Sequence, residues 1–136
     1  MTKVKRNRRL LLKTAKRIET VPESYDQANW CQPTDRAPCG TAACLAGELI
    51  ICSAPTVEEG VKLLRDRYQL PDFPGTSEMA ANLAGLTEVE TNKLFPGDVG
   101  DWPDPYRTRY VAAETQQERA KAAAELLRYL ADGGEV

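Results

Sequence analysis

Cysteine is the residue best suited to chemistry in this sequence, with thiols at Cys31, Cys39, Cys44 and Cys52. Their C-x7-C-x4-C-x7-C spacing lacks the close C-x2-C pairs typical of structural zinc sites, so we predict no metal site. Cys39 differs from the other thiols because it directly precedes a predicted helix start. Free N–H groups and the helix dipole at such a start lower a thiol pKa and attract anions.

The residues around Cys39 therefore form a candidate ligand site, which comprises Arg36, Cys39, Gly40, Thr41 and Cys44. Their position predicts either a cradle for a small anionic or nucleotide-like ligand or a reactive thiol. The alternative interpretation is that Cys39 and Cys44 are packing residues at a tight junction, which is the commonest role of a free cysteine.

The sequence contains no histidine, the residue most often used in acid–base catalysis. Ser-His-Asp catalysis, Cys-His catalysis and histidine metal sites are thereby excluded. The remaining carboxylates, thiols and hydroxyls show no recognisable acid–base pair. We therefore predict no catalytic residue and no cofactor, and we expect a protein that is not an enzyme.

Basic residues are concentrated at the N-terminus. Residues 1–18 carry eight basic side chains and no acid, so this segment has a charge of +8 against −10 for the rest. The pattern predicts a helix over 8–20, with Leu11, Ala15 and Ile18 on its buried face. The opposite face carries a basic stripe of Arg6, Arg9, Lys13, Lys16 and Arg17.

The basic stripe has two interpretations. It is either a solvated helix face that docks on the acidic remainder of the chain or a nucleic-acid-binding surface, since phosphate neutralisation requires clustered Lys and Arg. Residues 1–9, which precede or begin the predicted helix, are expected to form a flexible basic arm.

A central apolar helix is predicted at about 41–52 to position these candidate residues. Between Ala37 and Pro55, Glu48 is the sole ionisable residue apart from the thiols. A segment so poor in charge must be covered on nearly all sides. Thr41 is the expected N-cap, and Pro55 is expected to end the helix near residues 52–53.

Further helix starts are predicted by capping boxes at Thr56–Glu59, Thr87–Glu90 and Thr115–Glu118. A short helix capped by Thr76 or Ser77 is expected to end at Gly85, and the C-terminal helix is expected to end before Gly133. No convincing alternating strand is visible. The sequence thus predicts an all-α fold, with residues 1–136 forming a single compact domain of five or six helices around 41–52.

A resemblance adds to this interpretation. Trp30, the string Cys39-Gly-Thr-Ala-Ala-Cys-Leu-Ala-Gly47, Leu86-Thr-Glu88, Leu94-Phe95 and a closing helix resemble a family of small, uncharacterised bacterial and phage proteins. That family typically has tryptophan after the glycine, where this chain has Glu48. The resemblance implies a shared fold and a bacterial or phage source, and it implies no activity.

The leading functional prediction is a non-enzymatic α-helical binding protein, encoded by a phage or mobile element, that acts through a protein partner. Two alternatives stay open: a binder of an anionic ligand at 39–44, and a nucleic-acid binder that uses the basic stripe. No apolar run reaches the roughly 18 residues of a membrane span or forms a signal-peptide core, so we expect no membrane association and a cytoplasmic location.

Overall fold

The structure is a computed structural model, and it describes residues 5–27, 32–33, 41–42, 44–68, 75–96 and 99–136. Seven α-helices lie in this part of the chain: α1 (Arg8–Thr20), α2 (Leu45–Ser53), α3 (Val57–Tyr68), α4 (Gly75–Ala84), α5 (Glu88–Leu94), α6 (Tyr106–Ala112) and α7 (Gln116–Ala131). A 3-10 turn, η1 (Pro22–Ser24), follows α1. Two short strands, β1 (Gln32–Pro33) and β2 (Thr41–Ala42), pair antiparallel, with Gln32 opposite Ala42. The fold is all-α, as predicted, although its helices are more numerous than expected.

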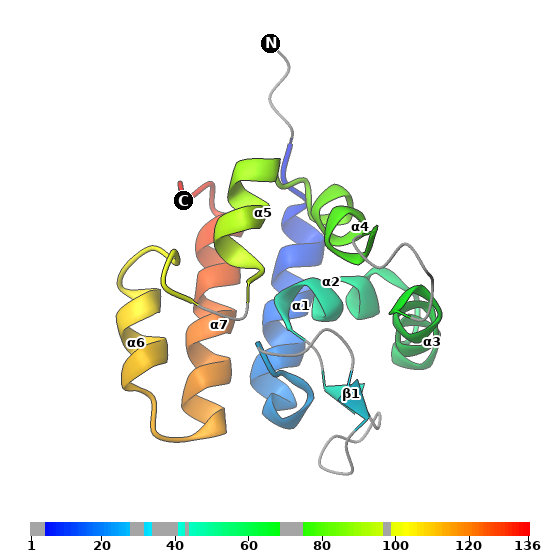
Figure 1. Ribbon diagram of the computed structural model, residues 1–136, viewed down its shortest axis with the longest axis horizontal. Coiled ribbons are helices and arrows are strands. Elements are labelled where there is room, and N and C mark those ends of the chain that lie inside the picture. The colour runs from blue at the N-terminus through cyan, green and yellow to red at the C-terminus, as the bar shows by residue number, and fades with distance from the viewer. Residues whose placement is uncertain (1–4, 28–31, 34–40, 43, 69–74, 97–98) are drawn as a thin grey trace.

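Helices α1 and α7 lie side by side and antiparallel through the middle of the molecule (Figure 1). Gln116 at the start of α7 donates to the carbonyl of Pro22 at 2.9 Å, and Arg8 at the start of α1 donates to the carbonyl of Ala131 at 3.0 Å. Buried alanines on α7, including Ala120 and Ala123, allow the two helices to pack closely. Helix α6 lies on the outer side of α7, whereas α2, α3 and α4 lie on the other side of α1 (Figure 1).

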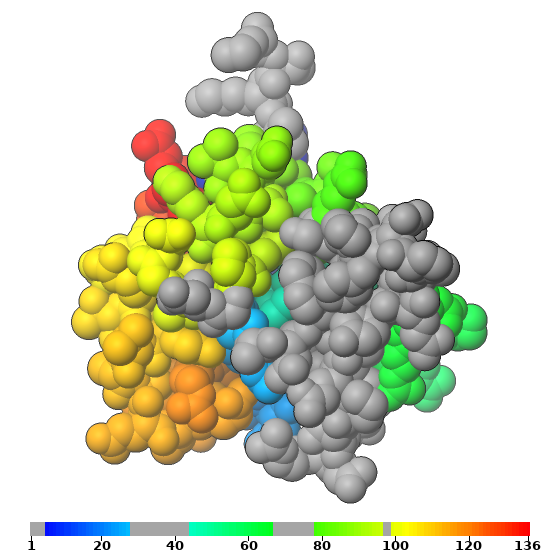
Figure 2. All heavy atoms as spheres, viewed as in Figure 1, coloured from blue at the N-terminus to red at the C-terminus, as the bar shows by residue number. Residues whose placement is uncertain are grey.

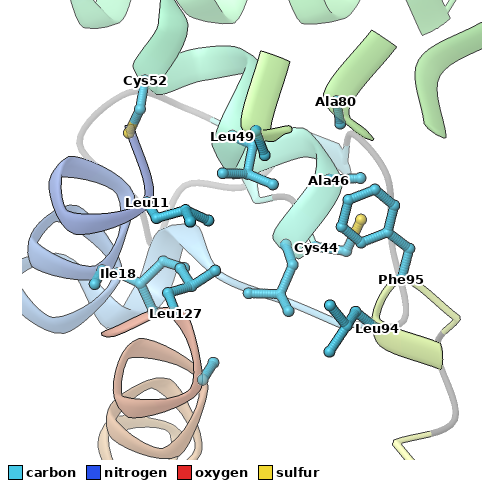
Figure 3. Close-up of a cluster of buried hydrophobic side chains, with 14 of the residues drawn as sticks. Leu11, Ile18, Cys44, Ala46, Leu49, Cys52, Ala80, Leu94, Phe95 and Leu127 are labelled. Atoms are coloured by element: carbon cyan, nitrogen blue, oxygen red, sulfur yellow. The ribbon is translucent and has the colours of Figure 1, made fainter. Parts of the chain in front are cut away.

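Helix α2 is the buried centre of the fold, because every residue from Leu45 to Cys52 is buried. It packs on α1, α3 and α4. Figure 3 shows Leu49 of α2 in the core cluster that also includes Leu11 and Ile18 of α1 and Leu127 of α7. The predicted central apolar helix is therefore present.

The predicted start of this helix at Thr41 is wrong. Thr41 and Ala42 are extended because their backbone pairs with β1, and α2 begins only at Leu45, with Cys44 as its N-cap. The strand pairing depends on β1 at residues 32–33, so the apolar sequence of 41–52 does not reveal it. The predicted end holds, since the last helical residue is Ser53, two residues before Pro55.

Helix α3 approaches α2 closely through Gly60. A Cβ atom at this position would lie 2.1 Å from the carbonyl oxygen of Ile51, far inside van der Waals contact. Any side chain at Gly60 would therefore force α3 away from the last turn of α2. The glycine that permits this close approach therefore belongs to α3 and not to the central helix itself.

The predicted helix caps are largely confirmed. Thr87 and Glu90 form a complete capping box, and Thr56 and Thr115 each accept a hydrogen bond from the backbone N–H three residues ahead. Gly85 and Gly133 follow α4 and α7 with positive φ angles of 72° and 90°. Helix α4, however, begins at Gly75, before the predicted caps Thr76 and Ser77.

Helix α6 was not predicted. None of its residues is buried, so residues 106–112 carry no apolar stripe that would reveal a helix. Two tyrosines attach it to its neighbours: the ring of Tyr106 contacts Tyr129, and the ring of Tyr110 packs edge-on against Trp102 at 5.1 Å between centroids. In the view of Figure 2, the atoms of α5 and α6 are at the surface of the molecule.

Part of the N-terminal arm is anchored rather than flexible. The backbone N–H of Asn7 donates to the carbonyl of Ala84 at 2.8 Å, and the Asn7 side chain caps α1 by accepting from the N–H of Leu10. Arg6 donates to the carbonyl of Leu130 at 2.9 Å and forms an ion pair with Glu90. These contacts hold the start of α1 against α4, α5 and the end of α7.

Candidate functional site

The ligand site predicted at the start of the central helix is only partly described. Arg36, Cys39 and Gly40 lie outside the described residues. The structure therefore does not test the predicted reactivity of Cys39. Of the other two residues, Thr41 belongs to β2 and Cys44 is the N-cap of α2. The described part of this site is therefore the N-terminal end of α2, and its geometry decides what a ligand could reach there.

Gln27 occupies the N-terminal end of α2. Its side-chain oxygen accepts from the backbone N–H of Leu45 at 3.3 Å and from the hydroxyl of buried Tyr25 at 2.9 Å. Its amide nitrogen donates to the carbonyls of Leu94 and Pro96, at 3.1 and 2.9 Å, where α5 ends. An N–H group that an anion would use is thus already bound by a side chain of the protein itself.

Cys44 is packed rather than open. Its side chain is buried, and Figure 3 shows it at the end of α2 that lies toward Leu94 and Phe95. Burial raises the pKa of its thiol to about 11 and outweighs the N–H groups of Gly47 and Ala46, which lower it. The thiol is therefore protonated at neutral pH, and its surroundings match the packing interpretation.

Glu48 is a fully buried carboxylate in the first turn of α2. Its Oε2 accepts a hydrogen bond from Arg17 Nε at 2.8 Å, whereas the buried Oε1 has no donor within hydrogen-bond distance among the described residues. Burial raises the pKa of Glu48 to about 7, although the charge of Arg17 and the hydroxyl of Ser24 lower it. Arg17 is itself nearly buried, so this ion pair joins α1 to α2 inside the protein.

The basic stripe of α1 is divided by these contacts. Arg6 and Arg17 are turned inward to Glu90 and Glu48, so two of the five predicted nucleic-acid-binding residues hold acidic partners of the same chain. The other three, Arg9, Lys13 and Lys16, remain exposed on α1. Of these three, Arg9 and Lys13 lie near the C-terminal end of α2.

An open groove lies at this C-terminal end of α2, which we call the α2-end groove. It has a volume of about 400 Å³ and runs between the start of α1, the end of α2 and α4. Its polar members are Asn7, Arg9, Lys13 and Ser53, and its apolar members are Leu10, Cys52, Ala54, Pro55 and Leu83. No carboxylate is among the described residues that line it.

The two cations of the groove, Arg9 and Lys13, differ in their contacts. Lys13 Nζ donates to the carbonyl of Ala54 at 3.3 Å, where a cation compensates the free carbonyls at a helix C-terminus. The side chain of Arg9 has no hydrogen bond or ion pair within the described parts of the chain. Leu10 and Cys52 are buried and form the floor. Burial also raises the pKa of the Cys52 thiol to about 11, so the floor is uncharged.

Two other grooves have a different character. The one between α4 and α5, of about 610 Å³, includes Glu78 and Glu88 and no basic residue among its described members. The one between α6 and α7, of about 500 Å³, mixes both charges, and the ion pair of Arg109 and Glu125 lies in it. Of the three, the α2-end groove alone combines an apolar floor with charged residues that are all basic among its described members.

The α2-end groove was not predicted as a unit. Arg9 and Lys13 were selected from the sequence for their charge, but nothing in the sequence placed them beside Ser53 and Leu83, which lie about 40 and 70 residues later in the chain. Gln27 was also missed, because a single glutamine in an irregular connector carries no signal of its five hydrogen bonds.

Comparison of the chain with protein-family models, with curated proteins and with solved structures found no match in any of the three. The resemblance to a bacterial and phage family therefore stays a prediction. Within the described ranges, no helix is both long and apolar enough to cross a membrane. The geometry of the two ends of α2 is thus the basis for inferring function.

Proposed function

We propose that this chain is a non-enzymatic α-helical binding protein that acts through a protein partner, and that the partner docks in the α2-end groove. One observation carries the proposal: the groove combines an apolar floor, formed by Leu10 and Cys52, with the exposed cations Arg9 and Lys13. An apolar centre with a polar rim is the usual anatomy of a protein-binding surface. Side chains from three helices build it, so its shape is fixed by the core.

The buried groups support a binding role over catalysis. Cys44 and Cys52 are protonated at neutral pH because burial raises their thiol pKa to about 11, and Glu48 is enclosed with Arg17. A catalytic nucleophile or base must be open to its substrate and have a pKa matched to its task. Glu48 instead joins α2 to α1 through Arg17, and both thiols lie in the core.

Site-specific photo-crosslinking tests the proposal. A photoreactive amino acid at Ala54, which lines the groove, should cross-link a protein from a lysate of the native host. The same amino acid at Val111 on α6, 71% exposed, is the control and should give no comparable adduct. Arg9→Glu should weaken the Ala54 adduct, whereas Lys16→Glu, an equal charge change outside the groove, should leave it unchanged.

Two outcomes contradict the proposal. Equal adducts from Ala54 and Val111 would mean that contact is not localised to the groove. Adducts that contain only nucleic acid would replace a protein partner by the basic-stripe alternative.

A further inference from the structure

We infer that the segment seated in the α2-end groove is acidic and carries at least one large apolar side chain. This inference rests on the proposed function and names the chemistry of the partner. A helical or extended segment that presents two carboxylates beside a leucine- or phenylalanine-sized side chain would match the groove on charge and polarity at once.

The charge of the rim determines the sign of the partner. Arg9 and Lys13 lie four residues apart on α1, and neither faces a carboxylate among the described residues that line the groove. Four residues correspond to about 6 Å along a helix axis, which is close to the separation of alternate side chains on an extended strand. Two carboxylates of one short segment can therefore reach both cations.

The floor selects an apolar side chain between those carboxylates. Leu10 and Cys52 are buried there, and Leu83 and Ala54 are half-buried beside them. A volume of about 400 Å³ is at the small end of ligand clefts, which suits one or two side chains rather than a folded domain. Covering this floor removes apolar surface from water, which is the main favourable term in docking.

Nucleic acid fits the groove less well. Neutralising a phosphate backbone takes several well-placed cations, but Arg6 and Arg17 of the stripe are held by Glu90 and Glu48. No aromatic side chain for base stacking is present among the described lining residues. Glu58 and Glu59 follow Pro55 in the chain and are exposed, so a polyanion extending past the groove would meet carboxylates.

A peptide selection tests the chemistry of the occupant. The full-length protein is used to select from a random library of twelve-residue displayed peptides, and peptides that bind Arg9→Glu equally well are removed. We expect the remaining peptides to be enriched in Asp and Glu around a Leu or Phe. For a selected peptide, Arg9→Glu should weaken the affinity about tenfold, because charge reversal removes an attraction and adds a repulsion.

Matched controls separate the groove from the rest of the stripe. Lys16→Glu makes the same charge change on α1 outside the groove and should change the affinity less than about twofold. Replacing the acidic residues of the peptide by Gln, or its apolar residue by Ser, should weaken binding in both cases. A twenty-nucleotide single strand and a twenty-base-pair duplex are measured at the same low salt.

The results discriminate between this inference and the proposed function. Enrichment of neutral or basic peptides that still require the groove overturns the acidic partner but leaves a protein partner in place. Failure to enrich any groove-dependent peptide overturns both. Binding of the DNA probes that weakens equally in Arg9→Glu and Lys16→Glu overturns both in favour of nucleic acid.

Discussion

The two ends of helix α2 differ in what they leave available to another molecule. At the N-terminal end, Gln27 binds the N–H of Leu45 and the carbonyls that end α5, and Cys44 is buried. At the C-terminal end, Lys13 reaches the carbonyl of Ala54, but Arg9 and the apolar floor stay open. One end has been used to assemble the core, and the other forms a surface.

This difference shows that an electrostatic preference does not by itself make a site. Helix N-termini favour anions and C-termini favour cations, whatever surrounds them. At the start of α2, where the sequence suggested an anion site, the amide dipole of Gln27 meets that preference from within the chain. At the end of α2, cations are supplied by α1, and they face solvent.

The largest loss of stability is expected for a substitution at the N-terminal end of α2. Gln27→Ala would remove the buried hydrogen bonds to the N–H of Leu45, the hydroxyl of Tyr25 and the carbonyl of Pro96. The carbonyl of Leu94 would keep the hydrogen bond that Trp102 Nε1 donates to it. We expect a loss of about 3–5 kcal/mol in the free energy of unfolding, measured by urea denaturation. Gln117→Ala on the exposed face of α7 is the control, with an expected change within about 0.5 kcal/mol. Similar effects of both variants would show that the hydrogen bonds of Gln27 do not stabilise the fold.

Measuring the free energy of unfolding against pH tests the buried ion pair of Glu48 and Arg17 near the N-terminal end of α2. Burial raises the pKa of Glu48 to about 7 in the folded protein, from the ordinary glutamate value of 4.5 that we assign to the unfolded chain. Between these values the folded state holds a proton that the unfolded state has lost, so stability falls as pH rises from about 4.5 to 7. The size of this loss is roughly 3 kcal/mol, and it is constant above that range.

No histidine titrates in this pH range, because the chain contains none. A hydrogen bond from Arg128 lowers the pKa of Glu19, and one from the Thr108 hydroxyl lowers that of Asp104, so both act at more acidic pH. Glu48→Gln should flatten the stability profile between pH 5 and 8, whereas Glu58→Gln on the exposed face of α3 should not. An unchanged slope in Glu48→Gln would show that this carboxyl does not titrate there.

Thiol alkylation sharpens the comparison of the two ends. Cys52 lies on the floor of the open groove, whereas Cys44 is enclosed at the other end and 1% exposed. We expect iodoacetamide to label Cys52 about tenfold faster than Cys44 at pH 8, which corresponds to about 1.4 kcal/mol less opening free energy. Peptide mass spectrometry resolves the two sites.

Both thiols should nevertheless react slowly, because burial raises the pKa of each to about 11. Val111→Cys, at a position 71% exposed, supplies the fast reference in the same protein. Labelling of Cys44 at the rate of this reference would mean that the N-terminal end of α2 is open to solvent.

The smallest effect on stability is expected at the open end. Arg9→Gln removes an exposed cation that holds no partner within the described residues, so the free energy of unfolding should change by no more than about 0.5 kcal/mol. Lys16→Gln should behave alike in thermal melts. A loss above about 1.5 kcal/mol in Arg9→Gln would assign it a structural role and remove it from the free rim of the groove.

Much of the fold follows from local patterns. The periodicity of Leu11, Ala15 and Ile18 predicted α1 from residue 8 to 20, which matches the structure, and the capping residues Thr56, Thr87 and Thr115 marked three helix starts. These features are local because capping bonds and helical periodicity involve residues three or four apart. Helix α6 escaped prediction because its residues carry no buried stripe.

What the sequence determined by itself is the all-α class, the apolar centre near Glu48 and the excess of positive charge at the N-terminus. Only the tertiary structure decided which end of α2 stays open. Gln27 closes one end through carbonyls 67 and 69 residues away, and the groove at the other end joins Arg9 to Leu83. Such contacts depend on how helices pack across the chain, and a local pattern of charge or polarity cannot specify them.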